Sequence, residues 1–160
     1  MNRRLLGIFA LFAFPYLATA AGDSALDRAT LRGLTALNIV VDKLDPQLEA
    51  AGIKSEAVRA RLEDRLHAAG ITVDTTKTDF LAIRMMAVRD NRGPFAVAIT
   101  IGAYQPVTLS RDKNVKTATQ TWEVETILLA DPKLLYRGAM DSIDDLAARF
   151  VAAYRSVNPQ

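Results

Sequence analysis

The sequence predicts an α+β domain in which two helices pack on one face of a mainly antiparallel sheet. Three observations lead to this fold class. Several stretches alternate with the two-residue period of strands, two stretches repeat with the period of an amphipathic helix, and three of the strands follow one another through polar turns. The expected order of elements is β-α-β-β-β-β-α.

A strand and a short helix begin the predicted domain. Apolar residues alternate over 37–41, as they do on a strand with one well-buried face. Asp45 is then expected to cap a short helix that has Pro46 at its first position and ends at Gly52.

A longer helix is expected from Ser55, a common N-cap residue, to Gly70. Apolar residues recur at a spacing of about four along one stripe of this helix. They are Val58, Leu62, Leu66 and Ala69. Gly70 is expected to end the helix in the left-handed conformation, with Ile71 folding back on Leu66 in a Schellman motif.

Four strands follow the longer helix. The first is short and is expected at 71–74. The three longer ones are expected over 79–89, 95–104 and 118–129. Their connections, 90–93 and 110–114, are rich in the Asn, Asp and Gly that form tight turns, so the three strands are expected to form a meander.

The last predicted element is a helix that begins at Ser142. Asp145, three residues later, is expected to complete a capping box, and Asp144 adds a negative charge that favours a helix N-terminus. Pro159 prevents the helix from continuing. The expected buried stripe is Ile143, Leu146, Phe150 and Tyr154.

Residues 1–20 are expected to be a cleavable secretory signal peptide. Positive charge at Arg3 and Arg4 precedes an uncharged apolar run of 13 residues and a stretch of small residues that ends at Ala20. The apolar run is shorter than the roughly 20 residues that a membrane-spanning helix needs. We therefore expect cleavage between Ala20 and Ala21, which leaves no stable membrane anchor.

Composition restricts the partners and the location of the remaining chain. We expect a flexible leader over 21–32 and one α+β domain over 33–160, with 18 basic and 18 acidic residues after cleavage. Such a neutral chain is not expected to bind nucleic acid. The sequence contains no cysteine, so disulfides, thiol catalysis and a lipoprotein anchor are excluded. We expect a periplasmic or secreted protein.

His67 is the only histidine and lies late in the longer helix, where it is expected to interact with the helix dipole rather than to act in catalysis. Two sets of possible metal ligands are assigned structural roles. Asp141, Asp144 and Asp145 lack the spacing of a calcium loop, and helix capping is the favoured role. Met85, Met86 and Met140 are assigned to core filling, because adjacent residues of a strand point to opposite faces. We expect no cofactor and no metal.

Arg84, Trp122, Glu123 and Glu125 are the candidate binding residues. Trp122 flanked by two carboxylates is compatible with a sugar platform, although a core anchor is the favoured role of the indole. Trp122, Val124, Thr126 and Leu128 are expected on one face of their strand, opposite the glutamates. Arg84 interrupts an apolar strand, so a cross-strand ion pair with Glu123 or Glu125 is expected.

The strand over 79–89 has apolar residues on both faces. One set is Leu81, Ile83 and Met85, and the other is Phe80, Ala82, Met86 and Val88. Because two helices cover only one side of a sheet, the second set is expected to meet a partner protein or a second copy in a homodimer.

Four short stretches carry a resemblance to known proteins: Leu44-Asp45-Pro46, Gly70-Ile71-Thr72-Val73, Thr121-Trp122 and Val157-Asn158-Pro159. With the order of elements, they resemble uncharacterised exported proteins of Gram-negative bacteria, and in outline the N-terminal α/β domain of TolB. The resemblance implies binding to other envelope proteins. It carries over no functional residue, and the propeller repeats of TolB are absent.

Two functions remain open from the sequence. The first is a non-enzymatic interaction or accessory module of the cell envelope that binds an envelope protein or itself. The alternative is a small-ligand binder or hydrolase that uses a pocket near the four candidate residues Arg84, Trp122, Glu123 and Glu125. No catalytic motif supports the alternative.

Overall fold

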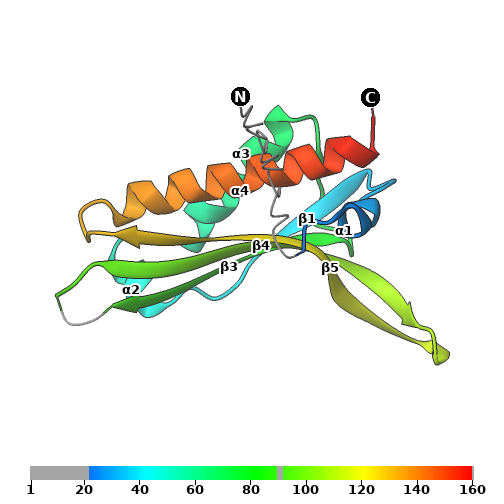
Figure 1. Ribbon diagram of the computed structural model, residues 1–160, viewed down its shortest axis with the longest axis horizontal. Coiled ribbons are helices and arrows are strands. Elements are labelled where there is room, and N and C mark those ends of the chain that lie inside the picture. Colours follow the sequence, from blue (N-terminus) through cyan, green and yellow to red (C-terminus); the bar gives the residue numbers. More distant parts are fainter. Residues whose placement is uncertain (1–21, 90–91, 160) are drawn as a thin grey trace, which may run out of the picture.

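The computed structural model describes residues 22–89 and 92–159 and confirms the α+β fold class (Figure 1). The predicted signal peptide and its cleavage site lie outside the described residues. The elements in chain order are α1 (Ala25–Ala29), β1 (Ala36–Val41), α2 (Pro46–Ala50), α3 (Ser55–Ala68), β2 (Thr72–Val73), β3 (Phe80–Arg89), β4 (Phe95–Leu109), β5 (Asp112–Ala130) and α4 (Leu135–Val157).

The five strands form one mixed sheet in the order β2-β1-β3-β4-β5. β3, β4 and β5 are antiparallel, as the predicted meander requires. β1 is parallel to both β2 and β3. The connection from β1 to β2 contains α2 and α3, because a parallel pair needs a long crossover that a tight turn cannot provide.

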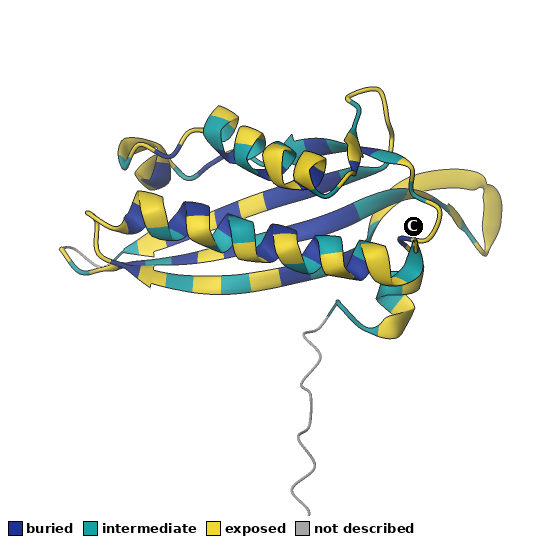
Figure 2. Cartoon of the chain, turned by 90° about the horizontal axis from the view of Figure 1, so that it is seen from above, coloured by how far each residue is buried: buried dark blue, intermediate teal, exposed yellow. Residues whose placement is uncertain are grey.

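Two helices, α3 and α4, lie side by side on one face of the sheet (Figures 1 and 2). Alternate residues of β3 face them: Leu81, Ile83 and Met85 are at most 2% exposed. The largest buried side chain, Trp122 of β5, packs edge-on against Phe150 of α4 with ring centroids 5.2 Å apart. Burial of these apolar side chains is the main stabilising contribution to the fold.

The end of α3 has the predicted geometry. Gly70 has a φ of +78°, and its N–H donates to the carbonyl of His67 at 2.9 Å. The N–H of Ile71 donates to the carbonyl of Leu66, also at 2.9 Å, which completes the Schellman motif. The N-cap is Lys54 rather than Ser55, and it makes no side-chain capping bond.

The start of α4 was predicted wrongly, because the helix begins at Leu135 and not at Ser142. Because Gly138 is a poor helix former, the sequence pattern does not indicate the two helical turns that precede Ser142. Its lack of a side chain has a packing reason, since a Cβ there would lie 3.1 Å from a methyl group of Leu128 on β5. Although α4 is long, no helix in the described part of the chain is apolar enough over a sufficient length to cross a membrane.

Asp144 joins α3 to α4, which corrects its predicted role at a helix N-terminus. Its carboxylate accepts hydrogen bonds from Arg61 Nε at 2.8 Å and from Arg65 Nε at 2.7 Å, both on α3. The hydrogen bonds from Arg65 and Arg61 lower the pKa of Asp144 against the opposing effect of burial. The carboxylate is only 16% exposed, so water screens this ion pair less than a fully exposed one.

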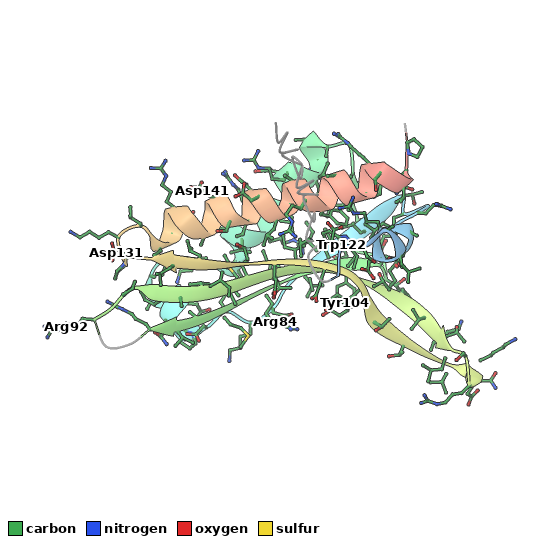
Figure 3. The ribbon with its side chains drawn as sticks, viewed as in Figure 1. Arg84, Arg92, Tyr104, Trp122, Asp131 and Asp141 are labelled. Carbon is green, nitrogen blue, oxygen red and sulfur yellow. The ribbon has the colours of Figure 1, made fainter. Side chains whose placement is uncertain are left out.

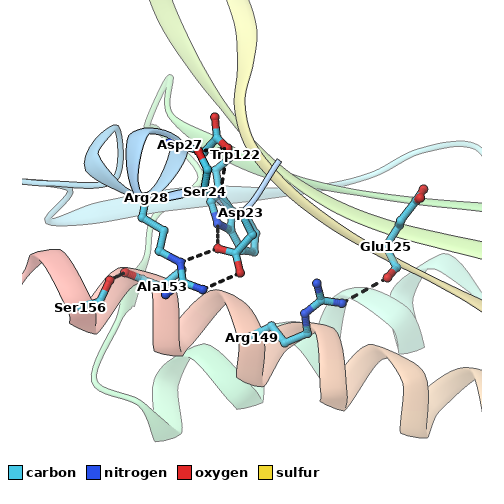
Figure 4. Close-up of polar contacts among 9 residues, drawn as sticks. All are labelled: Asp23, Ser24, Asp27, Arg28, Trp122, Glu125, Arg149, Ala153 and Ser156. Carbon is cyan, nitrogen blue, oxygen red and sulfur yellow. Dashed lines mark hydrogen bonds and ion pairs between the residues drawn. The ribbon is translucent and has the colours of Figure 1, made fainter. Parts of the chain in front are cut away.

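The segment over 22–32 is ordered and is not a flexible leader. Ser24 and Asp27 form a capping box at the start of α1, and Leu31 is fully buried. Asp23 accepts a hydrogen bond from the indole N–H of Trp122 at 2.7 Å and two bonds from Arg28 (Figure 4). The N-terminal segment therefore completes the core beneath the end of α4.

Replacement of Asp144 by alanine is expected to lower the free energy of unfolding by about 1–2 kcal/mol, because two arginines lose a shared, mostly buried acceptor. Asp141→Ala is the matched control. Its ion pair with Arg137 is exposed on the same helix, and its loss is expected to cost under about 0.5 kcal/mol. Urea unfolding measures both values, and equal losses would contradict the role assigned to Asp144.

The same experiment has a pH dependence of defined sign. Since the folded-state pKa of Asp144 is lowered, its contribution is fully present above the ordinary carboxyl pKa of about 3.9 and is lost as the pH falls through the lowered value. The difference between wild type and Asp144→Ala is therefore expected to be constant from pH 7 to 5 and to shrink below pH 4.

Replacement of Asp23 by alanine is expected to release the N-terminal segment from Trp122. The indole N–H then loses a charged acceptor, at a cost of about 1–2 kcal/mol of unfolding free energy. Because Trp122 is the only tryptophan, its fluorescence reports the change directly, and a shift to longer wavelength is expected. Asp42→Ala, which removes an acid from the other face, should leave the spectrum unchanged; an identical spectrum for Asp23→Ala would refute the contact.

Candidate functional site

The sheet has one face that α3 and α4 leave uncovered, which we call the open face. The alternation of each strand places one set of side chains under the helices and the other set on the open face. Figure 3 shows this for labelled residues: Trp122 lies on the helix side of the sheet, and Arg84 and Tyr104 lie on the opposite side. The open face runs from polar residues near Tyr104 to apolar residues near the β3–β4 connection.

An apolar patch occupies one end of the open face. It consists of two cross-strand rows, one of Val88, Ala96 and Leu129 and the other of Met86, Ala98 and Ile127. The four large side chains are strongly exposed: Met86 by 62%, Val88 by 71%, Ile127 by 77% and Leu129 by 70%. Together they form one contiguous apolar surface across three strands, and contiguous exposed apolar surfaces are often interaction sites.

The polar part of the open face begins in the next row. Arg84 of β3 aligns with Thr100 of β4, which aligns with Glu125 of β5. The expected pair between Arg84 and a glutamate is wrong, because the guanidinium Nε lies 2.9 Å from Asp42 Oδ2. Asp42 follows β1 on the other side of β3, closer than β5, and its hydrogen bond raises the pKa of Arg84.

The rows beyond Arg84 are held by stacking and by hydrogen bonds. Phe80 and Tyr104 stack with ring centroids 5.0 Å apart and nearly parallel planes. The Tyr104 hydroxyl donates to the side-chain oxygen of Gln120 at 2.7 Å. The Gln120 amide nitrogen in turn donates to Glu123. Glu123 is thus engaged, whereas Glu125 is exposed, with Thr100 as its cross-strand neighbour.

The structure separates the four sequence-predicted binding residues. Arg84, Glu123 and Glu125 share the open face, whereas Trp122 is 1% exposed in the core on the other side. The predicted directions of Trp122 and the glutamates on β5 are therefore confirmed. A pocket that combines the indole with the three charged groups does not exist among the described residues, because the sheet itself lies between them.

A two-stranded arm extends from the sheet beyond the open face. β4 and β5 continue to Leu109 and back from Asp112, so the strands are longer and the turn is shorter than predicted. A bulge at Ala103/Tyr104 lies where the arm bends away from the helices (Figure 1). Most of its residues are exposed, and its tip carries Arg111, Lys113 and Lys116.

The remaining residues with possible chemistry have mostly structural positions. His67 lies in the last turn of α3, as predicted, and it is exposed. Met85 and Met140 are buried, but Met86 belongs to the apolar patch and not to the core. An open groove of about 610 Å³ between α3 and α4 contains the three aspartates of α4, of which Asp144 is already bound to arginines. The described residues contain no group of three His, Asp or Glu side chains positioned to hold a metal.

Ile127 and Leu129 were missed as functional candidates from the sequence. They follow Glu123 and Glu125 at the same two-residue spacing, so they share the wet face of β5. That alternation was the available signal. Apolar residues at the end of an otherwise polar strand face indicate a surface that binds a partner. The sequence does not show that Ile127 and Leu129 lie in the same rows as Met86 and Val88, because this depends on the strand register.

No protein-family model and no curated protein sequence matches this chain. The solved structures that resemble it in part include the following two. A dodecamer of a PelC variant from Paraburkholderia phytofirmans has 11% sequence identity and a TM-score of 0.41, over 71% of this chain and 82% of the PelC chain. A minor lipoprotein from Acinetobacter baumannii has 10% identity and a TM-score of 0.37, over 78% of this chain and 95% of that chain. Neither resemblance assigns a family or a function.

A lysine placed on each face of β3 is expected to have opposite consequences. Ile83→Lys buries an unpaired charge under the helices and is expected to lower the free energy of unfolding by about 4 kcal/mol or more. Met86→Lys lies on the open face and is expected to change it by less than about 0.5 kcal/mol. Thermal unfolding followed by circular dichroism compares them, and a strongly destabilised Met86→Lys would show that the patch is packed against something.

Proposed function

We propose that this chain is a non-enzymatic accessory module of the cell envelope that binds a partner protein on the open face of its sheet. The observation that carries the proposal is the apolar patch, in which four large side chains are each more than three-fifths exposed. Soluble proteins rarely leave such a surface free, because covering it is favourable by about 25 cal/mol per Å².

The distribution of charge supports binding rather than catalysis. Asp23, Asp42 and Asp144 are each engaged by an arginine in the folded chain. The ion pairs of Asp42 and Asp144 join separate elements, and none of the three pairs lies in a closed cavity where a substrate is desolvated. The rim of the patch is polar, with Arg84 and Glu125 in the adjacent row, as at an interface with an apolar centre and a charged border.

The envelope location rests on the sequence of residues 1–20, whose charge, apolar run and small residues are those of an export signal. The arm adds a second support for a binding role. A two-stranded ribbon on its own is marginally stable in water, and a partner that packs against it and the open face stabilises it.

The test compares charge substitutions on and off the patch. The tagged protein, produced in its own cell with the envelope intact, is cross-linked and purified, and co-purifying proteins are identified by mass. Val88→Lys is expected to reduce recovery of the specific partner at least tenfold, because a buried charge disrupts the centre of the interface. Leu26→Lys is the matched control, since Leu26 is 80% exposed on α1, away from the patch.

Two outcomes decide against the proposal. If every co-purifying protein is recovered equally with Val88→Lys and Leu26→Lys, the patch is not the binding surface. If light scattering shows that the wild type is a dimer and Val88→Lys a monomer, the patch joins two copies of this chain instead of binding another protein.

A further inference from the structure

We propose that the outer edge of β5, from Glu125 to Leu129, receives an extended segment of a partner protein as an added sixth strand. This inference rests on the proposed function and specifies its mode of binding. Four features carry it: the free backbone groups of this edge, the contacts that limit its length, the hollow beside it, and the side chains that border it.

The backbone direction along β5 is fixed by one hydrogen bond. The N–H of Glu123 donates to the carbonyl of Gly22 at 3.0 Å, so it points away from β4. Residues two apart in a strand direct their N–H and C=O groups to the same side, and the β4–β5 register has no shift between Trp122 and Ala130. The N–H and C=O groups of Ile127 and Leu129 therefore point outward.

The chain covers one part of this edge and leaves the next part open. Gly22 takes the N–H of Glu123, and Arg149 of α4 donates to the carbonyl of Glu125 at 3.2 Å (Figure 4). β5 is an edge strand, and no other strand of the described chain pairs with its outer side. The open stretch ends where the chain turns after Asp131 into α4. A segment of about five extended residues fits this length.

A hollow of about 440 Å³ lies beside the open stretch on the helix side. Leu128, Leu134 and Gly138 form its apolar part, and Arg137 and Asp141 form its polar part. In an added strand, alternate side chains point to opposite faces of the sheet. One set enters this hollow, and the other set extends the apolar patch next to Ile127 and Leu129. Addition of an extended peptide to an exposed sheet edge is a common mode of peptide binding.

The side chains on the open face of β5 define the sequence that fits. Residues directly opposite on neighbouring strands interact, so apolar residues are favoured opposite Leu129 and Ile127. Glu125 is exposed and has Thr100, not a cation, as its neighbour on β4. A basic residue is therefore favoured opposite Glu125. For an antiparallel segment, the order is apolar-x-apolar-x-basic.

A second copy of β5 fits this edge less well. Antiparallel self-pairing about Ile127 sets Leu129 opposite Glu125. The exposed carboxylate of each copy then lies opposite an apolar side chain and gains no cation. Charge complementarity thus favours a segment of a different protein.

The test uses a fluorescein-labelled peptide, Thr-Val-Thr-Val-Thr-Lys-Thr, titrated with the full chain and followed by fluorescence anisotropy. Saturable binding is expected. Ile127→Pro is expected to weaken it at least tenfold, because proline removes the outward N–H and blocks the incoming strand. The fold is expected to persist, since that N–H makes no bond to β4; circular dichroism checks this. Absence of binding to the wild type, or equal binding to folded Ile127→Pro, overturns the proposal.

A charge exchange tests the same site if the proline variant does not fold. Glu125→Lys is expected to weaken binding of the lysine peptide, and a peptide with Glu in place of Lys is expected to bind Glu125→Lys better than wild type. Identical affinities in all four combinations would contradict the predicted alignment. If the envelope partner is recovered with Ile127→Pro but not with Val88→Lys, the proposed function is retained and strand addition is rejected.

Discussion

The structure depends on the burial of one face of a five-stranded sheet under two helices. β1, β3, β4 and β5 contribute alternate apolar side chains to this interface, and α3 and α4 supply the matching stripes. Trp122 of β5 and Phe150 of α4, both buried, meet within it. Two helices suffice for one face only. The side chains of the open face therefore do not have to pack in the core, and they are available for binding.

Two polar clusters position segments whose placement the apolar contact alone does not determine. Asp144 sets the position of α3 against α4, and Asp23 ties the N-terminal segment to Trp122. Both carboxylates have a lowered pKa because arginines hold the charged form. Acids and bases that serve as such connectors are not available to a substrate. These contacts therefore belong to the folded framework and not to the proposed binding surface.

Much of the fold could be predicted because its signals are local. The periodicities of the strands and of α3 depend on residues that are close in the sequence. The same is true of the helix start at Asp45-Pro46 and the helix end at Gly70. The errors arose where a distant contact overrides the local signal. Ser142 and Asp145 indicated a helix start, but α4 already begins at Leu135. It includes Gly138, where Leu128 of β5 occupies the space of a side chain. The polar segment over 22–32 suggested a flexible leader, but Trp122, 99 residues from Asp23, orders it.

For the candidate site, the sequence by itself determined that β3 has two apolar faces and that the glutamates of β5 lie opposite Trp122, because side-chain alternation is a property of each strand alone. Only the tertiary structure decided which face the helices cover, that Arg84 pairs with Asp42, and that Met86, Val88, Ile127 and Leu129 form one surface. The physical reason is strand register. It is set by the packing of the whole sheet against α3 and α4, and it alone determines which side chains of neighbouring strands stand next to one another.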